Sequence, residues 1–519
     1  MNDDTVFALA SGAGRAAIAV LRISGPDSAR LLTALCGSLP LPRRAVVRAL
    51  HDREGDVLDR AMVLWLPGPG SYTGEDSAEL HLHAGRAVVD AVAAALGSLG
   101  ARPAEPGEFT RRAFLNGKLD LVSAEAVHDL VAAETDAQRR QALRQLDGAL
   151  GDLYRDWSGR LRGALAQQEA LIDFPDEDLP PEVEADLLAS VRSLRAEIAA
   201  HLDDHRRGER LREGLFFAIT GAPNVGKSSL INALAERDVA IVSATPGTTR
   251  DAIETRIVLG GVPVTLIDTA GLREATDPIE AEGVRRALSR AASADLVITV
   301  VEAGTAIEPA ATGLVVANKS DLVTEQSCAP SYQPGSALTL SHDTTVASSS
   351  GLTRGSARTE PVPDMMAPAS RHEMPGSDPG TTNDRAARHS VGPLALPSAT
   401  PTAASLIVAD KSCHDADQPP SALLISALTG AGLPELRARL AAEAVALTQS
   451  SGPAPLTRAR HRLALQDAAG ALRDAESAHE PELRGEAMRL ALRALGSITG
   501  HVGVEDILDS IFRQFCIGK

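Results

Sequence analysis

The chain has 519 residues, and a usual size of roughly 150 residues per domain predicts about three domains. Its formal net charge of -17 excludes a general affinity for the phosphate backbone of nucleic acids, so any such contact needs a local basic patch. The four cysteines, Cys36, Cys328, Cys413 and Cys516, form no CxxC pair, and no apolar run reaches the length of a membrane span. We therefore predict a cytoplasmic protein without structural zinc or membrane contact.

Residues 1–117 have the pattern of a small α+β domain. Short apolar runs at 17–23, 61–66 and 78–82 alternate with Gly/Pro turns and predict strands. The Ala-rich stretch at 87–96 has helical periodicity. We therefore expect a separate N-terminal domain.

Residues 118–212 are predicted to be helical. Apolar residues recur there at three- or four-residue steps and predict one stripe along one long helix: Leu143, Leu146, Leu150, Leu153, Trp157, Leu161 and Leu165. The helical pattern returns in residues 449–519 and ends with an apolar face formed by Val504, Leu508, Ile511, Phe512 and Phe515. The simplest arrangement folds both segments into one helical bundle, with residues 213–448 inserted between them.

The inserted region 213–448 alternates strand and helix patterns. Continuous apolar runs at 216–220, 264–268, 296–301, 314–318 and 423–426 are typical of parallel strands that are buried on both faces. Residues at about 325–420 are instead rich in Ser, Thr, Pro, Ala and Gly, which predicts a disordered insertion that leaves the domain as a surface loop. Within it, the triplet at 406–408 is either a displaced strand or a chance apolar run.

The motif GAPNVGKS at 221–228 follows a predicted strand and precedes a predicted helix, which is the context of a phosphate-binding loop. Its glycines let backbone amides surround phosphate oxygens, Lys227 reaches the outer phosphates, and Ser228 offers a hydroxyl to Mg²⁺. In DTAG at 268–271, the Asp268 carboxylate can hold Mg²⁺ through water, and Thr249 is expected on the same ion.

The motif NKSD at 318–321 predicts guanine recognition. Asp321 can accept hydrogen bonds from guanine N1 and N2, Asn318 can contact the purine edge, and the stem of Lys319 can lie over the base. Because adenine lacks this pair of donors, we predict GTP as the substrate. The predicted GTP-binding residues are Asn224, Val225, Gly226, Lys227, Ser228, Ser229, Ser243, Ala244, Thr245, Pro246, Gly247, Thr248, Thr249, Asp268, Thr269, Ala270, Gly271, Asn318, Lys319, Ser320, Asp321, Ser426 and Ala427.

The residue after DTAG is Leu272, where Ras-like GTPases have the glutamine that orients the attacking water. Glu280 in the following segment is a candidate for this role. The alternative interpretation of Glu280 is a solvated glutamate at a helix start.

With these motifs the chain resembles the MnmE (TrmE) family of bacterial tRNA-modification GTPases. The matching segments are LRISGP, YTGED and PGEFTRRAFLNGKLDL, then IDFPDE, then APNVGKSSLINAL, GTTRD and DTAGLRE, and finally FCIGK. The resemblance implies a multidomain α+β and α/β protein. Its parts would be an N-terminal α+β folate-binding-like domain, a helical bundle made of two chain segments, and an inserted Ras-like P-loop GTPase domain.

The resemblance also implies specific sites. K⁺ would be bound by Asn224, Ser243, Thr245 and Thr248 when two G domains meet, and Glu280 would orient the water. A tetrahydrofolate one-carbon derivative would contact Arg22, Glu79, Lys118 and Lys519. Cys516 would match a cysteine needed for tRNA modification, whereas the residues alone also allow a small apolar side chain that closes the apolar face near the C-terminus.

Members of this family are homodimers that act with MnmG (GidA), a partner that contains FAD, in a heterotetramer. Together they add an aminomethyl or carboxymethylaminomethyl group to C5 of the wobble uridine of certain tRNAs. Two other interpretations stay open: an Era- or Der-like regulatory GTPase that acts on ribosomes, and a degenerate scaffold that binds GTP without modifying tRNA. Several arginines could contact tRNA, although solvated helix faces are the preferred interpretation: Arg139, Arg140, Arg144, Arg458, Arg460 and Arg462.

Overall fold

The computed structural model describes residues 4–12, 14–173, 181–236, 254–268, 294–305, 313–323, 422–449, 454–502 and 505–518. Backbone contacts separate residues 329–418 as a second unit, which lies outside these ranges, as does the apolar triplet at 406–408. All elements below belong to the first unit. None of the helices in the described ranges combines the length and hydrophobicity needed to cross a bilayer.

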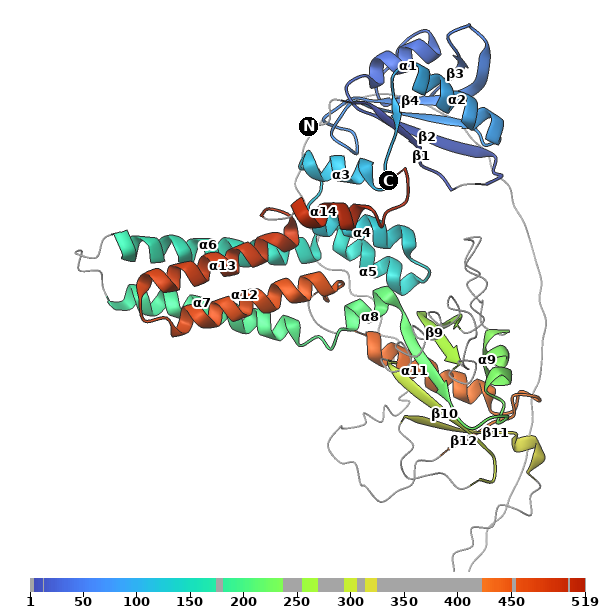
Figure 1. Cartoon of the computed structure of the whole chain (residues 1–519), viewed down its shortest axis with the longest axis vertical. Coiled ribbons are helices and arrows are strands. Elements are labelled where there is room, and N and C mark those ends of the chain that lie inside the picture. Colours follow the sequence, from blue (N-terminus) through green and yellow to red (C-terminus); the bar gives the residue numbers. More distant parts are fainter. Residues whose placement is uncertain are drawn as a thin grey trace, which may run out of the picture. The chain divides into compact units, whose positions relative to one another are not determined.

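The N-terminal region is a six-stranded sheet with two helices packed on one face (Figure 1). The strand order is β3-β4-β5-β2-β1-β6, and the neighbours are antiparallel except for β1 with β6. The elements are β1 (Val6–Leu9), β2 (Ile18–Ser24), α1 (Ser28–Cys36), β3 (Val46–His51), β4 (Val57–Leu66), β5 (Ser77–His83), α2 (Arg86–Ser98), β6 (Arg102–Pro103) and α3 (Glu108–Leu115). The three predicted strands and the predicted helix are confirmed as β2, β4, β5 and α2.

Period-2 alternation explains how this sheet buries one face. Leu21, Val63 and Leu80 point toward α1 and α2 and are fully or almost fully buried. The intervening residues of the same strands, such as Arg22 and Glu79, lie on the opposite face, which is only partly covered.

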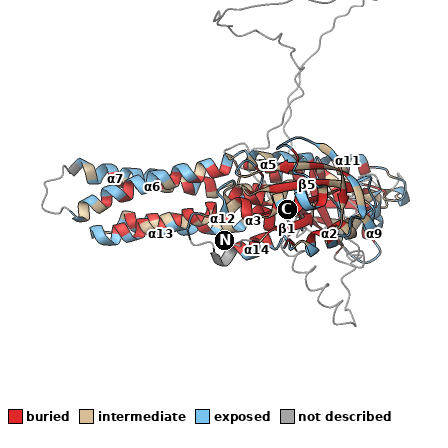
Figure 2. Ribbon diagram, turned by 90° about the horizontal axis from the view of Figure 1, so that it is seen from above, coloured by how far each residue is buried: buried red, intermediate tan, exposed pale blue. Residues whose placement is uncertain are grey.

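Two chain segments form the helical bundle, as predicted. The first contains α4 (Leu121–Ala132), α5 (Asp136–Leu146), α6 (Ala149–Asp173), α7 (Pro181–Leu202) and α8 (Arg207–Glu213), and the second contains α12 (Ala459–Ser477), α13 (Pro481–Thr499) and α14 (Glu505–Phe512). Helices α6, α7, α12 and α13 pack side by side around one apolar core that includes Tyr154 and Trp157 (Figure 1). Buried positions alternate with exposed ones along these four helices (Figure 2), as expected for amphipathic helices.

The prediction of one long helix through the leucine stripe is wrong. The stripe is divided between α5 and α6, which are separated by Asp147 and Gly148. Gly148 has a φ of 99°, a left-handed conformation that ends the first helix, so the apolar spacing continues across a break in the backbone. The predicted C-terminal face is confirmed for Leu508, Ile511, Phe512 and Phe515, which pack against α4, whereas the side chain of Val504 lies outside the described residues.

The inserted region contains a second six-stranded sheet, of order β12-β11-β10-β7-β9-β8. Its elements are β7 (Leu215–Thr220), α9 (Lys227–Ala235), β8 (Glu254–Leu259), β9 (Val262–Asp268), β10 (Leu296–Glu302), β11 (Leu314–Asn318), the 3-10 turn η1 (Ser320–Leu322), β12 (Leu423–Leu424) and α11 (Leu433–Thr448). The five predicted strands are present and parallel, although β12 is shorter than expected. The antiparallel edge strand β8 was not predicted.

Candidate guanine-nucleotide site

The phosphate loop joins β7 to α9 and depends on two glycines. Gly221 has a φ of 142°, and a Cβ placed there would lie 2.2 Å from the carbonyl oxygen of Val300. Gly226 has a φ of 94°, and a Cβ there would lie 2.3 Å from Nδ2 of Asn318. Both the backbone conformation and the close approach therefore require glycine at these two positions.

Lys227 and Ser228 begin α9, directly after this loop. The Lys227 side chain is buried, and Nζ donates to the carbonyl oxygens of Gly221 at 2.9 Å and Ala222 at 2.7 Å. The Ser228 hydroxyl donates to Oδ2 of Asp268 at 2.9 Å. A hydroxyl and a carboxylate oxygen thus lie side by side, and such hard oxygen donors are the ligands that Mg²⁺ prefers. The start of α9 itself favours phosphate anions.

Asn318, which is 2% exposed, joins the phosphate loop to the loop that follows β12. Its Nδ2 donates to the carbonyl oxygen of Val225 at 2.9 Å, and its Oδ1 accepts from the backbone N–H of Ala427 at 3.0 Å. The Asn318 side chain therefore positions the phosphate loop against the loop after β12. The predicted contact of Asn318 with the purine edge stays a prediction.

Asp321 and Ser426 meet at the same end of the sheet. The Ser426 hydroxyl, which is fully buried, donates to Oδ1 of Asp321 at 2.5 Å and accepts from the backbone N–H of Thr429 at 3.1 Å. This contact orients the carboxylate expected to read guanine. Lys319 adopts a left-handed φ of 64°, and its Nζ lies 3.3 Å from Oε1 of Glu302.

The structure thus brings together the predicted residues of the phosphate loop, Asp268, the NKSD motif and Ser426-Ala427. Asn224 is exposed in the phosphate loop, with a left-handed φ of 65°. Other predicted positions lie outside the described residues: Ser243, Ala244, Thr245, Pro246, Gly247, Thr248, Thr249, Thr269, Ala270, Gly271, Leu272, Glu280 and Lys519.

The predicted folate residues surround a second location, on the open face of the N-terminal sheet. Arg22 in β2 and Glu79 in β5 are paired across neighbouring strands, with 2.9 Å between Arg22 Nη2 and Glu79 Oε1. The guanidinium of Arg22 lies 5.4 Å from the ring centroid of Tyr72. Lys118 Nζ donates to the carbonyl oxygen of Pro69 at 3.0 Å. All three predicted residues in the described ranges therefore lie around the loop that contains Pro69 and Tyr72.

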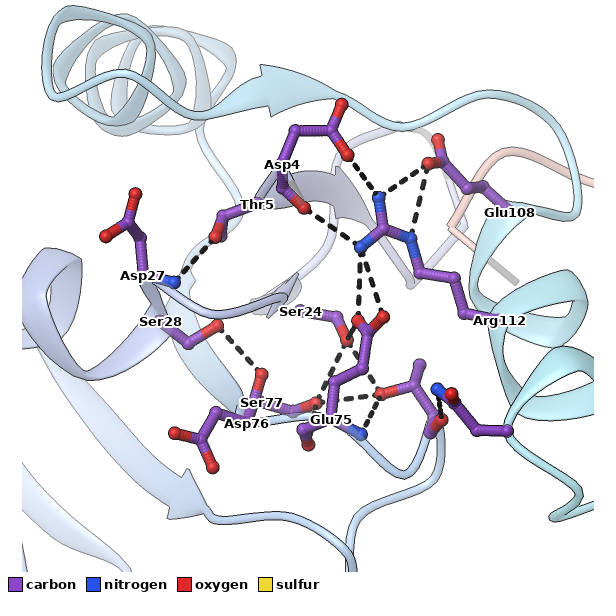
Figure 3. A network of polar contacts seen from close by, with 12 residues as sticks. Asp4, Thr5, Ser24, Asp27, Ser28, Glu75, Asp76, Ser77, Glu108 and Arg112 are labelled. Atoms are coloured by element: carbon purple, nitrogen blue, oxygen red, sulfur yellow. Dashed lines mark hydrogen bonds and ion pairs between the residues drawn. The ribbon is translucent and has the colours of Figure 1, made fainter. Parts of the chain in front are cut away.

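Arg112 organises the support beneath this loop (Figure 3). Its guanidinium lies 2.8 Å from Glu108 Oε1, 3.1 Å from Glu75 Oε2 and 2.9 Å from Asp4 Oδ1. Burial opposes ionisation of Glu108, but Arg102 and Arg112 outweigh it and hold the pKa of Glu108 below its usual value. These residues explain why the YTGED and PGEFTRR segments contain charges at these positions, a role that the sequence pattern did not indicate.

Cys516 lies in a tail that returns to the N-terminal region. Its carbonyl oxygen accepts from the backbone N–H of Gly107 at 3.4 Å, and a Cβ on Gly518 would lie 2.2 Å from the carbonyl oxygen of Leu9. The Cys516 residue itself is exposed, whereas Phe512 and Phe515 are buried. The interpretation of Cys516 as a buried apolar side chain is therefore wrong.

The preferred interpretation of Arg458, Arg460 and Arg462 as solvated is also wrong. Their side chains are 11%, 23% and 15% exposed and are ion-paired. Arg460 binds both carboxylate oxygens of Glu125 at 2.7 Å, and Arg462 pairs with Asp204 and Glu209. These contacts also leave the three guanidinium groups poorly placed to contact tRNA. On α5, by contrast, Arg139 and Arg140 are exposed and pair with Asp136, and Arg144 is exposed, as predicted.

A mainly parallel sheet, a phosphate loop between its strand β7 and a helix, and an NKSD motif beside that loop define a P-loop domain of the guanine-nucleotide-binding class. Comparison with known proteins agrees with this class. The family described as "GTP-binding protein TrmE N-terminus" matches residues 5–118, and the family described as "MnmE helical domain" matches residues 121–516.

The whole chain also matches curated relatives. Proteins named "tRNA modification GTPase MnmE" are 51% identical over 519 residues in Granulibacter bethesdensis, with 100% of both chains covered, and 52% identical in Gluconacetobacter diazotrophicus, with 99% of this chain and 98% of the relative covered. A GTP-binding protein from Sulfolobus solfataricus in complex with GDP is 17% identical, with 46% of this chain and 61% of that protein covered and a TM-score of 0.14. The chain belongs to the MnmE (TrmE) family.

Proposed function

We propose that this protein hydrolyses GTP in order to drive a tRNA modification. The observation that supports the proposal is the nucleotide site, in which the Ser228 hydroxyl donates to Asp268 and the Ser426 hydroxyl donates to Asp321, the carboxylate expected to bind guanine. Full-length relatives named as tRNA modification GTPases support the process in which this site acts. The predicted N-terminal and helical regions would perform or position the modification chemistry.

The tRNA step is proposed to occur at C5 of the wobble uridine of certain tRNAs, jointly with the FAD-containing partner MnmG (GidA). A tetrahydrofolate derivative would supply the one-carbon unit, held by Arg22, Glu79, Lys118 and Lys519. The arrangement of the first three around one loop supports this site. Cys516 is exposed, as a residue that acts on a substrate must be.

For hydrolysis, we propose Mg²⁺ on Ser228 and Thr249 and K⁺ on Asn224, Ser243, Thr245 and Thr248. The contact between Ser228 and Asp268 fits Mg²⁺ at the phosphate loop. The exposed position of Asn224 fits a cation shared between two G domains. Glu280 would orient the attacking water, which Leu272 cannot do.

We also propose that the protein is a homodimer in the cytoplasm, and the open face of the N-terminal sheet supports the dimer. Val47 and Ile18 on this face are 69% and 58% exposed, and Val20, Met62 and Leu64 beside them are only partly buried. Covering these apolar side chains with a second copy would remove them from water.

Mass spectrometry of wobble uridines in a strain that lacks the gene tests the function. The modification should be absent, should return with the unaltered protein, and should not return with Lys227→Ala or Cys516→Ser. Glu486→Gln, at an exposed site on α13, is the control and should restore it. Unchanged uridines in the deletion strain would refute the proposed function and leave both alternatives, an Era- or Der-like regulatory GTPase and a scaffold that binds GTP without modifying tRNA.

The base assignment has its own test. Asp321→Asn removes the acceptor for the two guanine donors, so GTP affinity should fall at least about 100-fold while the xanthine nucleotide, which offers an acceptor, binds better. Equal affinities of the variant and the unaltered protein for GTP would show that Asp321 does not bind the guanine base.

A further inference from the structure

Asp129 in α4 joins the two places where the chain enters and leaves the inserted nucleotide domain. Its Oδ1 accepts from Arg212 Nε at 2.9 Å and from Arg458 Nη2 at 2.7 Å. Arg212 lies in α8, directly before β7, and Arg458 is the N-cap of α12, the first helix after that domain. The side chain of Asp129 is 10% exposed, so both ion pairs are shielded from water.

The two chain segments that connect the bundle to the nucleotide domain, one at α8 and one just before α12, are called the crossings below. They also touch each other through their backbones. A Cβ on Gly208 in α8 would lie 2.2 Å from the carbonyl oxygen of Leu456, and Leu456 is fully buried. A movement of the nucleotide domain that displaces these two segments would therefore act on Asp129.

The same helix contacts the C-terminal tail. His128, the neighbour of Asp129, places its ring 4.9 Å from that of Phe515, centroid to centroid. Leu121 and Ala124 on α4 share an apolar cluster with Phe512 and Phe515. Phe515 directly precedes Cys516, whose backbone is bound to Gly107 in the N-terminal region.

A small polar cavity lies beside α4. Its volume is about 60 Å³, and its lining includes His128, Asp129, Gln138, Gln145 and Arg212. Gln145 Oε1 is buried and has no hydrogen-bond partner among the described residues, so this polar space is not closely packed. Close packing, by contrast, would hold the Asp129–Arg212 pair in one position.

We infer that α4 couples the nucleotide domain to the tail that carries Cys516, with Asp129 and His128 as positioning residues. Asp129 receives the displacement of the crossings, and His128 passes it to Phe515 because both side chains are on one rigid helix. The consequence for tRNA rests on the proposed function of Cys516. The coupling itself concerns only the position of the thiol.

The test is the rate at which N-ethylmaleimide alkylates Cys516 in the full-length protein, followed by mass spectrometry of the C-terminal peptide. The rate with GDP should differ about fivefold or more from the rate with a non-hydrolysable GTP analogue. Asp129→Asn and His128→Leu should each abolish this difference, while GDP affinity is retained. His128→Phe should keep it, because an aromatic ring can still contact Phe515. Asp136→Asn, which removes an exposed ion-paired carboxylate on α5, is the matched control and should also keep it.

Equal alkylation rates in both nucleotide states of the unaltered protein would overturn the inference. So would a full difference in either Asp129→Asn or His128→Leu, and the second variant leaves the buried ion pairs intact should the first fail to fold. If the nucleotide-dependent difference is present but Cys516→Ser still supports tRNA modification, the proposed role of Cys516 fails and the coupling stands.

Discussion

Replacing Glu125 by Gln tests whether the buried ion pairs of α4 and α12 hold the bundle together. The Glu125 side chain is 1% exposed and binds Arg460 through two contacts of 2.7 Å, with His461 Nε2 at 3.0 Å and Arg458 Nε at 3.4 Å. Burial opposes the charge, but Arg460, His461 and Arg458 hold the pKa of Glu125 well below its usual value. Glutamine has nearly the same shape but removes the carboxylate that neutralises the partly buried guanidinium of Arg460.

Removal of one partner from a buried ion pair costs about 3–5 kcal/mol. For a helical region of this size, that cost lowers the midpoint of thermal unfolding by about 10 °C, measured by circular dichroism of the helices. Glu486→Gln is the control, because Glu486 is 51% exposed and lies 3.3 Å from Arg489, so its loss should cost less than about 1 kcal/mol. Equal midpoints for the two variants would refute a structural role of this network. If Arg460→Ala lost tRNA affinity without losing stability, Arg460 would be a tRNA contact and not a structural residue of the bundle.

Four further predictions concern the nucleotide site and the pH dependence of the bundle. Gly221→Ala should abolish nucleotide binding in a fluorescent GDP titration, because its Cβ would lie 2.2 Å from the oxygen of Val300; normal affinity would contradict the loop geometry. Burial lowers the pKa of His201 to about 4 from 6.5. His201 therefore binds a proton less readily in the folded state than in the unfolded state. The free energy of unfolding falls as the pH drops below about 6.5, by roughly 2 kcal/mol between pH 7 and pH 5. Denaturant unfolding should show a smaller loss in His201→Gln, and an identical slope in this variant would exclude His201 as the cause. GTP turnover should be much higher in K⁺ than in Na⁺, and this preference should vanish in Asn224→Ala; Glu280→Ala should lower turnover without lowering GTP affinity, and full activity would leave Glu280 as a solvated side chain.

The sheet of the nucleotide domain could be predicted because its central strands are buried on both faces. All seven residues of β9 are buried, so a continuous apolar run was the expected signal. Edge strand β8 lacks such a run, yet it is joined to β9 by Gly260-Gly261, with φ values of 59° and 81°. A two-glycine turn between two strands is a hairpin signal, and it would have identified β8.

The break between α5 and α6 was missed for a different reason. Hydrophobic spacing reports which face is buried, but it does not report whether the backbone is continuous. Gly148 was the available signal, since glycine commonly ends a helix in a left-handed conformation. The buried arginines offered no local signal at all, because Glu125 and Arg460 are separated by 335 positions in the chain.

Contacts between residues far apart in the chain also explain how a nucleotide domain can be inserted into a helical bundle. An inserted domain is tolerated when the two ends that receive it are close together in the host. Here Arg212 before the insertion and Arg458 after it share one oxygen of Asp129, and Gly208 packs against the backbone of Leu456. The bundle therefore binds both crossings at one place, through one carboxylate that accepts from both arginines. Loss of that carboxylate would separate the crossings without removing any residue of the nucleotide site, so its effect on nucleotide-dependent motion should exceed its effect on nucleotide affinity.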